Sequence, residues 1–456
     1  MRRLLTIATP LLLLVALPLI AKPQNQKAIV GATLIDGTGG SPRKEAVIVI
    51  EGTRISQVGT RNTIRLQKNT TVIDATGKFI IPGLADMHNH LGEGNFDLNQ
   101  GPADYQTNLR RLLGWGFTSV FNFGMPSIED FAQLKRVSAA EDSAFPHFFG
   151  SGQLLRAKEG HGSLQGGFTP ETPAEARRQV RELKKAKVDA VKFVHTDLRY
   201  VTTQSRPLLK PEVIKAIVDE AHKLGLRAFV HAPVLEYAKE ALRVGADGLV
   251  HAVISDRVDD EFLLLMKSNN AAYITTHAIF EAAGDIGKWS RRMVEFDELG
   301  LIPKQVHQSG LSPTTVERWE EKWNNTVYTR DRLKVMRENL KDVWEAGILV
   351  VAGSDTGNSG AGTLLGLASQ LELLLLLEAG LSPELVLQAA TINAARMLGR
   401  EKDFGTIEAG KLADLLILDA NPLIDIRNIR RINRVIKGGL SYKQSELLTF
   451  NQKRRS

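Results

Sequence analysis

The middle of the chain alternates short apolar segments with amphipathic helical patterns, and this alternation constrains the fold more than any other feature. The segment PEVIKAIVDEAHKLG, residues 211–225, places its apolar residues three and four positions apart, as one face of a helix does. Short apolar runs separated by such helices favour a closed α/β barrel, the (β/α)8 or TIM barrel, over an open sheet. The expected strands are 79–88, 118–124, 147–152, 189–195, 227–232, 247–253, 271–278 and 348–355.

Both ends of the chain are rich in β-like runs and turns. Residues 27–82 alternate apolar runs with turn signals such as Asp36-Gly37, and residues 405–423, GTIEAGKLADLLILDANPL, have the same character. We expect the two ends to pair into one small composite β-sandwich domain. The predicted domains are 22–82 together with 404–456 as the sandwich, and 83–403 as the barrel, in which the polar stretch 279–328 is an insertion that could serve as a lid.

Residues 1–21, MRRLLTIATPLLLLVALPLIA, have the layout of a secretory signal peptide. Basic residues precede an apolar run, and a small residue, Ala21, stands before the expected cleavage site. An uncleaved N-terminal anchor is the alternative, but the short apolar core and its two prolines favour cleavage. We therefore expect an exported protein, periplasmic or secreted, without stable membrane insertion. The later apolar run LELLLLLEAG, 371–380, is too short to span a membrane and contains two glutamates, so it is predicted to be a buried helix.

Composition excludes several classes of function. The net charge of +7 is modest for 456 residues, and no basic stripe is interleaved with aromatic residues, so nucleic-acid binding is not expected. The chain contains no cysteine, which excludes disulfides and thiolate ligands. Any metal must therefore be held by His, Asp, Glu or a modified Lys.

Ionisable residues stand at the ends of the expected strands. The carboxyl ends of barrel strands share one rim, where active sites are found, and residues i and i+2 of a strand point the same way. A lone strand histidine is commonly structural, but barrel interiors prefer branched apolar residues, so a whole set of ionisable groups there requires a reason. Neutral imidazole and carboxylate are suitable zinc ligands. The set predicts a metal site formed by His88, His90, Lys192, His231, His251 and Asp355.

Lys192 lies in VDAVKFV, an apolar strand. One interpretation is a surface or ion-paired lysine. The other is that burial and nearby cations favour the neutral amine. A neutral amine can add CO2 and become a carbamate, an anionic ligand able to bridge two metal ions. We expect the carbamate.

The chain resembles the amidohydrolase superfamily, in the branch that contains imidazolonepropionases and Xaa-Pro dipeptidases. The resemblance spans nearly the whole mature chain and is carried by GATLIDGTGG, IPGLADMHNH, VDAVKF, FVHA, ALRVGADGLVHAV, VAGSDTG, ATINAARMLG and GTIEAGKLADLLILDANPL. These motifs are specific for the superfamily and weakly specific for substrate. Dipeptidases of this branch often have a tyrosine shortly after the fifth-strand histidine, where this chain has Pro233, and this departure weakens a dipeptidase assignment.

The resemblance implies two divalent ions, usually zinc, and a hydroxide between them that attacks an amide, peptide or cyclic amide C–N bond. His88, His90 and Asp355 would hold one ion, His231 and His251 the other, and carboxylated Lys192 would bridge them. Asp355 would be the catalytic residue, first as general base and then as general acid.

Other polar residues have open assignments. His161, in the loop after the third strand, is either a substrate contact, as a similar Gly-His is in relatives, or part of the loop structure. His277, at the expected end of the seventh strand, is either a substrate contact or structural. His195, Arg156 and Arg199 are more readily explained as structural or surface residues than as pocket contacts.

The leading hypothesis is an exported binuclear metal-dependent amidohydrolase acting on a small-molecule amide or peptide. The alternative is a mononuclear deaminase or an imidazolonepropionase-like ring-opening hydrolase, which would lack the bridging Lys192. An inactive scaffold homologue would have lost ligands, whereas every expected ligand is present here. The sequence leaves the substrate, the metal and the oligomeric state open, a homo-oligomer included.

Overall fold

The structure is a computed structural model that describes residues 26–91, 105–140, 143–162, 166–202, 204–298, 331–357 and 363–448, and residues 300, 317 and 321. The signal peptide predicted for residues 1–21 and most of the predicted lid beyond residue 298 lie outside the described residues.

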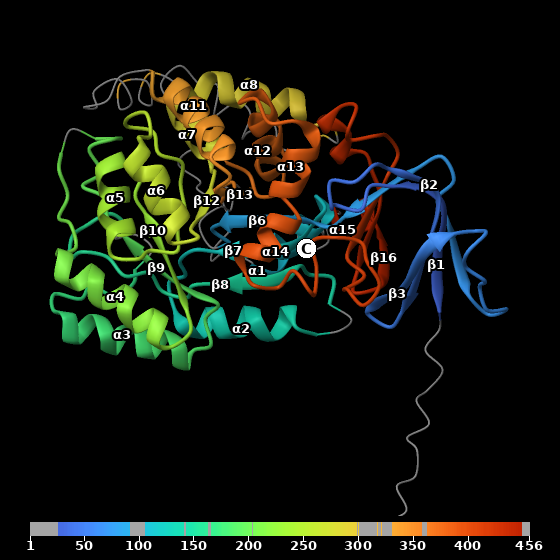
Figure 1. Cartoon of the computed structure of the whole chain (residues 1–456), viewed down its shortest axis with the longest axis horizontal. Coiled ribbons are helices and arrows are strands. Elements are labelled where there is room, and N and C mark those ends of the chain that lie inside the picture. Colours follow the sequence, from blue (N-terminus) through green and yellow to red (C-terminus); the bar gives the residue numbers. More distant parts are fainter. Residues whose placement is uncertain are drawn as a thin grey trace, which may run out of the picture.

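Short parallel strands form the centre of the larger part of the molecule (Figure 1). They fall into a three-stranded and a five-stranded sheet. In both sheets neighbouring strands pair in parallel, as they do in βαβ units. The first sheet contains β6 (Leu84–Asn89), β7 (Phe117–Asn122) and β8 (His147–Gly150), and the second contains β9 (Ala190–Val194), β10 (Arg227–His231), β11 (Gly248–Leu249), β12 (Ala272–Ile274) and β13 (Leu349–Val351).

Backbone contacts link the two sheets at both seams. Leu155, after β8, forms a parallel bridge with Phe193 of β9, and Asn89 of β6 forms one with Thr356, after β13. Around the second bridge, the N–H of His90 donates to the carbonyl of Thr356 at 2.8 Å. The arrangement is a TIM-barrel-like α/β fold, although the sheets are not joined into one continuous closed ladder.

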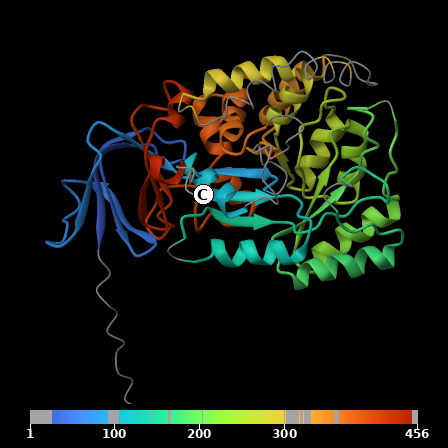
Figure 2. The same cartoon turned by 180° about the vertical axis from the view of Figure 1, so that it is seen from behind.

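Helices cover the outside of these strands (Figures 1 and 2). In α3, Thr172 and Glu175 form a capping box at the start of the helix, and Val180 and Leu183 are buried. The helices are α1 (Tyr105–Gly114), α2 (Ile128–Ser138), α3 (Pro173–Lys185), α4 (Pro211–Lys223), α5 (Leu235–Arg243), α6 (Asp260–Ser268), α7 (His277–Gly284), α8 (Ile286–Phe296), α11 (Arg332–Glu345), α12 (Leu367–Glu378), α13 (Pro383–Ala389), α14 (Ile392–Met397) and α15 (Gln444–Leu448).

Strands from both ends of the chain form one further sheet, which lies beside the barrel-like part in both views (Figures 1 and 2). The two ends meet where β5 pairs antiparallel with β14, for example at Ile81 and Leu416. They form a single eight-stranded sheet, so the predicted β-sandwich of two sheets is not confirmed. The strands are β1 (Lys27–Leu34), β2 (Arg43–Glu51), β3 (Arg54–Thr60), β4 (Thr71–Asp74), β5 (Phe79–Pro82), β14 (Leu415–Leu418), β15 (Ile432–Lys437) and β16 (Leu440–Lys443), with a 3-10 turn, η3 (Ile426–Arg430), before β15.

Four expected strands differ clearly from the structure. Those predicted at 247–253 and 348–355 are reduced to β11 (Gly248–Leu249) and β13 (Leu349–Val351). The strand predicted at 79–88 is divided at Gly83 into β5, in the terminal sheet, and β6, in the barrel. A Cβ on Gly83 would lie 2.1 Å from Oγ1 of Thr118, so only glycine allows the chain to cross so close to β7. The strand predicted at 271–278 ends at Ile274, because Thr276 adopts a left-handed conformation with φ 49° and α7 begins at His277.

The run 371–380 lies largely within α12, most of whose residues are buried, as predicted. Within the described part of the chain, we find no helix with both the length and the apolar character needed to cross a membrane.

Candidate metal centre

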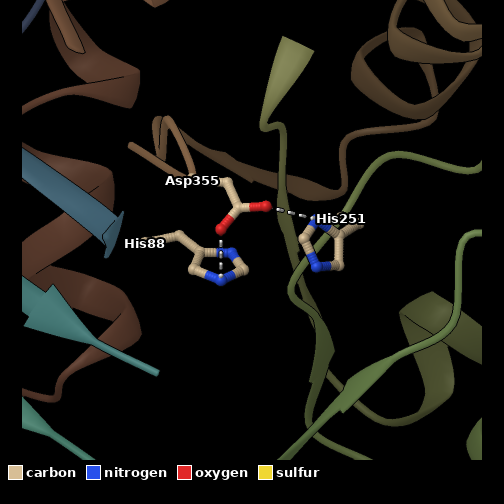
Figure 3. A group of neighbouring side chains, drawn as sticks. All are labelled: His88, His251 and Asp355. Carbon is tan, nitrogen blue, oxygen red and sulfur yellow. Dashed lines mark ion pairs between the residues drawn. The ribbon is translucent and has the colours of Figure 1, made fainter. Parts of the chain in front are cut away.

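Asp355 lies between His88 of β6 and His251, which follows β11 (Figure 3). Its Oδ1 is 3.0 Å from Nε2 of His90 and 3.5 Å from Nε2 of His88. Its Oδ2 is 4.0 Å from Nδ1 of His251. One ligand atom from each of His88, His251 and Asp355 lies within 4.8 Å of the others, a spacing suited to a shared metal ion. The N–H of Asp355 donates to the carbonyl of His88 at 2.7 Å, so the seam between β6 and β13 itself places the carboxylate.

The remaining predicted ligands adjoin this group. Nζ of Lys192 is 3.4 Å from Nε2 of His88, and the lysine is only 3% exposed. The ring centroids of His231 and His251 are 4.3 Å apart, and those of His251 and His88 are 4.7 Å apart. The structure therefore brings all six sequence-predicted residues together at the carboxyl ends of parallel strands.

Three of the imidazoles have one ring nitrogen engaged by the protein. Nδ1 of His88 is 2.6 Å from the carbonyl oxygen of Val250, and Nδ1 of His251 is 2.9 Å from Oγ1 of Thr276. For His231 the engaged atom is Nε2, 2.9 Å from the hydroxyl of Tyr200. Such contacts fix the ring orientation and leave the second nitrogen as the one that can hold a metal.

Burial sets the charge state of the cluster. It lowers the pKa of His88, His231 and His251 well below the ordinary value, and the positive charges of neighbouring residues lower it further. Neutral imidazole is the form that binds metal. Burial alone would raise the pKa of Asp355, but the hydrogen bond from His90 and nearby positive charges lower it below its usual value.

This donor set fits divalent ions. It combines neutral imidazoles, a carboxylate and an enclosed lysine without any thiolate, which suits zinc and similar metals. Nδ1 of His90 is buried and has no hydrogen-bond partner among the described residues. A buried polar atom of this kind is expected where a bound group, rather than the protein, supplies the missing partner.

A buried network of hydrogen bonds around Asp86 holds the backbone of His88 in place. The carboxylate of Asp86 accepts hydrogen bonds from the hydroxyls of Ser354 and Ser369 at 2.6 and 2.7 Å, and from the N–H of His88 at 3.2 Å. Burial raises the pKa of Asp86 to about 6. Gly357 allows close approach on the other side, because a Cβ there would lie 1.9 Å from the carbonyl oxygen of His90.

The two predicted substrate contacts differ in position. His161 lies against the cluster, with its ring centroid 4.6 Å from that of His231. The sequence predicted His277 at the end of a strand, but in the structure it begins α7 and is 1% exposed. Burial lowers its pKa to about 3. Roles in substrate binding stay predictions for both.

The residues that the sequence left open have protein partners. His195 pairs with Glu240 at 2.7 Å, and Arg199 pairs with Asp197. Arg156 donates to the carbonyls of Ala157 and Gly166. These contacts account for the three side chains as structural groups.

Sequence reasoning missed the residues that hold the ligands. Asp86 could have been noticed, because it lies two positions before His88 on the same strand and therefore on the same side. Thr276 and Tyr200 gave no such signal, since each lies outside a regular strand and acts across the fold.

A TIM-barrel-like α/β fold with imidazoles, a carboxylate and a lysine gathered at the strand ends defines a class of hydrolases. The model of the Amidohydrolase family matches residues 79–441, and the chain belongs to this family. The protein is accordingly an enzyme, a hydrolase of the amidohydrolase type.

Individual relatives agree with this membership. An imidazolonepropionase from Shouchella clausii (strain KSM-K16) is 26% identical over 409 residues, covering 86% of this chain and 84% of the relative. A dihydroorotase from Syntrophotalea carbinolica (strain DSM 2380 / NBRC 103641 / GraBd1) is 25% identical over 424 residues, covering 86% and 88%. A crystal structure of a Xaa-Pro dipeptidase with bound methionine has the same fold, with a TM-score of 0.71, 23% identity and coverage of 92% of this chain and 100% of that one.

Proposed function

We propose that this protein is an exported amidohydrolase that binds two divalent metal ions, most suitably zinc, and hydrolyses a C–N bond of a small amide, peptide or cyclic amide. The single observation that carries the binuclear part is the place of Lys192. It is enclosed beside His88 and lies in the strand next to β10, which supplies His231. These neighbours support a lysine that reaches both sets of imidazoles.

His88, His90 and Asp355 would hold one ion, and His231 and His251 the other, with Lys192 between them as a carbamate. Forming the carbamate joins the amine nitrogen to the carbon of CO2 and releases one proton. The product is an anion in a site otherwise dominated by neutral imidazoles. When bound, the ions would lower the pKa of a water molecule and polarise the scissile carbonyl.

Asp355 is placed to move the proton. Its pKa is held below the usual value, so it is a carboxylate at neutral pH and can accept a proton from the attacking water. The oxygen of that water joins the carbonyl carbon, the C–N bond breaks, and Asp355 returns the proton to the leaving nitrogen. The products are an acid and an amine, or a single ring-opened chain when the amide is cyclic.

A mononuclear ring-opening hydrolase is the second candidate, favoured by the likeness to an imidazolonepropionase. The two differ in whether Lys192 contributes to metal binding. The similar proteins include an imidazolonepropionase, a dihydroorotase and a Xaa-Pro dipeptidase, so screening should cover dipeptides, N-acyl amino acids, lactones and cyclic ureides.

The test is metal analysis by mass spectrometry on protein recovered from the extracytoplasmic fraction, where its absence would contradict export. The wild-type chain should contain close to two ions, and Lys192→Ala should lose metal and activity together. Lys215→Ala is the matched control, because Lys215 is an exposed lysine paired with Asp219. One tightly held ion, unchanged in Lys192→Ala, would overturn the binuclear proposal.

A further inference from the structure

Tyr200 is a buried tyrosine whose hydroxyl is directed at one of the proposed metal ligands. It lies in the turn after β9 and is only 4% exposed. Its hydroxyl is 2.9 Å from Nε2 of His231, and its ring lies edge-on to that of Phe280, with centroids 6.4 Å apart. A buried phenol needs a hydrogen-bond partner, and the imidazole of His231 supplies it.

The backbone around Tyr200 is held in place independently of that contact. Leu198 adopts a left-handed conformation with φ 65°, and its carbonyl accepts the N–H groups of Val201 and Thr202. The guanidinium of Arg332, which is 2% exposed, donates to the carbonyl of Tyr200. The phenol therefore reaches His231 from a turn that its own hydrogen bonds and Arg332 hold in place.

An imidazole that binds a metal keeps a lone pair on one nitrogen and a proton on the other. With Nε2 of His231 against Tyr200, the nitrogen left for a metal is Nδ1. We infer that Tyr200 is a positioning residue that orients His231 so that Nδ1 holds the second metal ion. In that state Nε2 carries the proton and donates it to the phenolic oxygen. The inference rests on the proposed function, because it assigns a partner to one of the proposed ligands.

Tyr237 provides a matched comparison. It is a half-buried tyrosine near the same turn, but its hydroxyl donates to Asp197 at 2.9 Å and its ring lies against His195. Neither of these is among the proposed ligands. A loss of metal binding caused merely by removing a hydroxyl near the rim would appear in both tyrosine variants.

The experiment compares wild type, Tyr200→Phe and Tyr237→Phe after removal of metal with a chelator. Each protein is titrated with Co²⁺, and both site affinities and the visible spectrum are recorded. Loss of an orienting partner typically weakens metal binding about 10- to 100-fold. We expect that weakening for one of the two classes of site in Tyr200→Phe, with the other class changed much less, and no such weakening in Tyr237→Phe.

A second measurement, the near-ultraviolet absorption, does not depend on the variant's stability. Metal binding should set the direction of the hydrogen bond at Tyr200, with Nε2 of His231 as the donor, and change the near-ultraviolet absorption of the wild type and Tyr237→Phe. The same change should be missing in folded Tyr200→Phe, checked by circular dichroism. Unchanged affinities in Tyr200→Phe, or equal losses in both variants, would overturn the inference while two-ion binding by the wild type still supports the proposed function. A wild type that binds no metal would overturn both.

Discussion

Replacing Glu372 with glutamine should remove a pH dependence of stability that originates beside the candidate metal centre. Glu372 lies on α12 and is 1% exposed. Its carboxylate accepts hydrogen bonds from Oγ1 of Thr275 at 2.5 Å and from the N–H groups of His277 and Ala278 at 3.0 and 2.6 Å. Burial raises its pKa to about 8, and the charge of Asp86 adds to the effect.

The sign follows from which state binds the proton. Between the ordinary pKa of 4.5 and the folded value of about 8, the folded chain keeps a proton on Glu372 that the unfolded chain releases. The stabilisation is therefore complete below pH 4.5 and is lost as the pH rises through 8. The two pKa values differ by about 3.5 pH units, each of which corresponds to roughly 1.4 kcal/mol, so the full loss is about 5 kcal/mol.

Glutamine has nearly the same shape and no such proton equilibrium. We expect the free energy of unfolding of the wild type, relative to Glu372→Gln, to fall by roughly 1.4 kcal/mol per pH unit between about pH 5 and pH 8. Urea unfolding of metal-free protein at several pH values measures this slope. Glu378→Gln is the control, because Glu378 lies on the same helix but is exposed and paired with Arg292. Parallel pH profiles for wild type and Glu372→Gln would refute the reasoning.

Two further substitutions test other parts of the structure. Gly357→Ala should lower stability by about 1–3 kcal/mol, because its φ is +97°, and should also lower metal affinity, because the added Cβ would meet the backbone of His90. Gly347→Ala is the control: its φ is +76° but the space around it is open, so this substitution should lower stability alone. Equal metal titrations for the two glycine variants would contradict this. Asp414→Ala should destabilise the chain by about 3 kcal/mol in chemical unfolding without changing metal content, because it removes the buried carboxylate that lies 3.8 Å from Nζ of Lys437 and 2.7 Å from Nε2 of His147. A change below about 0.5 kcal/mol, the range typical of surface sites, would show that this pair contributes little.

The sequence was sufficient for the parallel strands and for the residues at their ends. Apolar runs separated by amphipathic helices leave few alternatives to a barrel-like arrangement. Such an arrangement brings the carboxyl ends of the strands together irrespective of the sequences of the loops. His88 and Asp355 are far apart in sequence, yet each could be placed because it stands at the end of an expected strand. The geometry of the fold, rather than any local signal, brings them to 3.5 Å.

The sequence was insufficient to predict contacts between segments that are far apart in the chain. An alternating β pattern does not say whether strands share one sheet or form two, and here β5 joins β14 in a single sheet. The early end of β12 depends on Glu372, which binds the first N–H groups of α7 from a helix almost a hundred residues away. No local sequence pattern around His277 predicts that contact.

The structure separates the residues that would hold metal from those that would choose a substrate. Five of the six proposed ligands lie on or next to strands whose backbones are fixed by the neighbouring strands, and Asp355 is fixed by hydrogen bonding to His88 across a seam. His161 lies instead in a loop, and most of the insertion beyond residue 298 lies outside the described residues. Loops at this face can vary without disturbing the strands. For this reason the cluster defines the type of reaction, whereas the identity of the substrate depends on residues that the strand pattern does not determine.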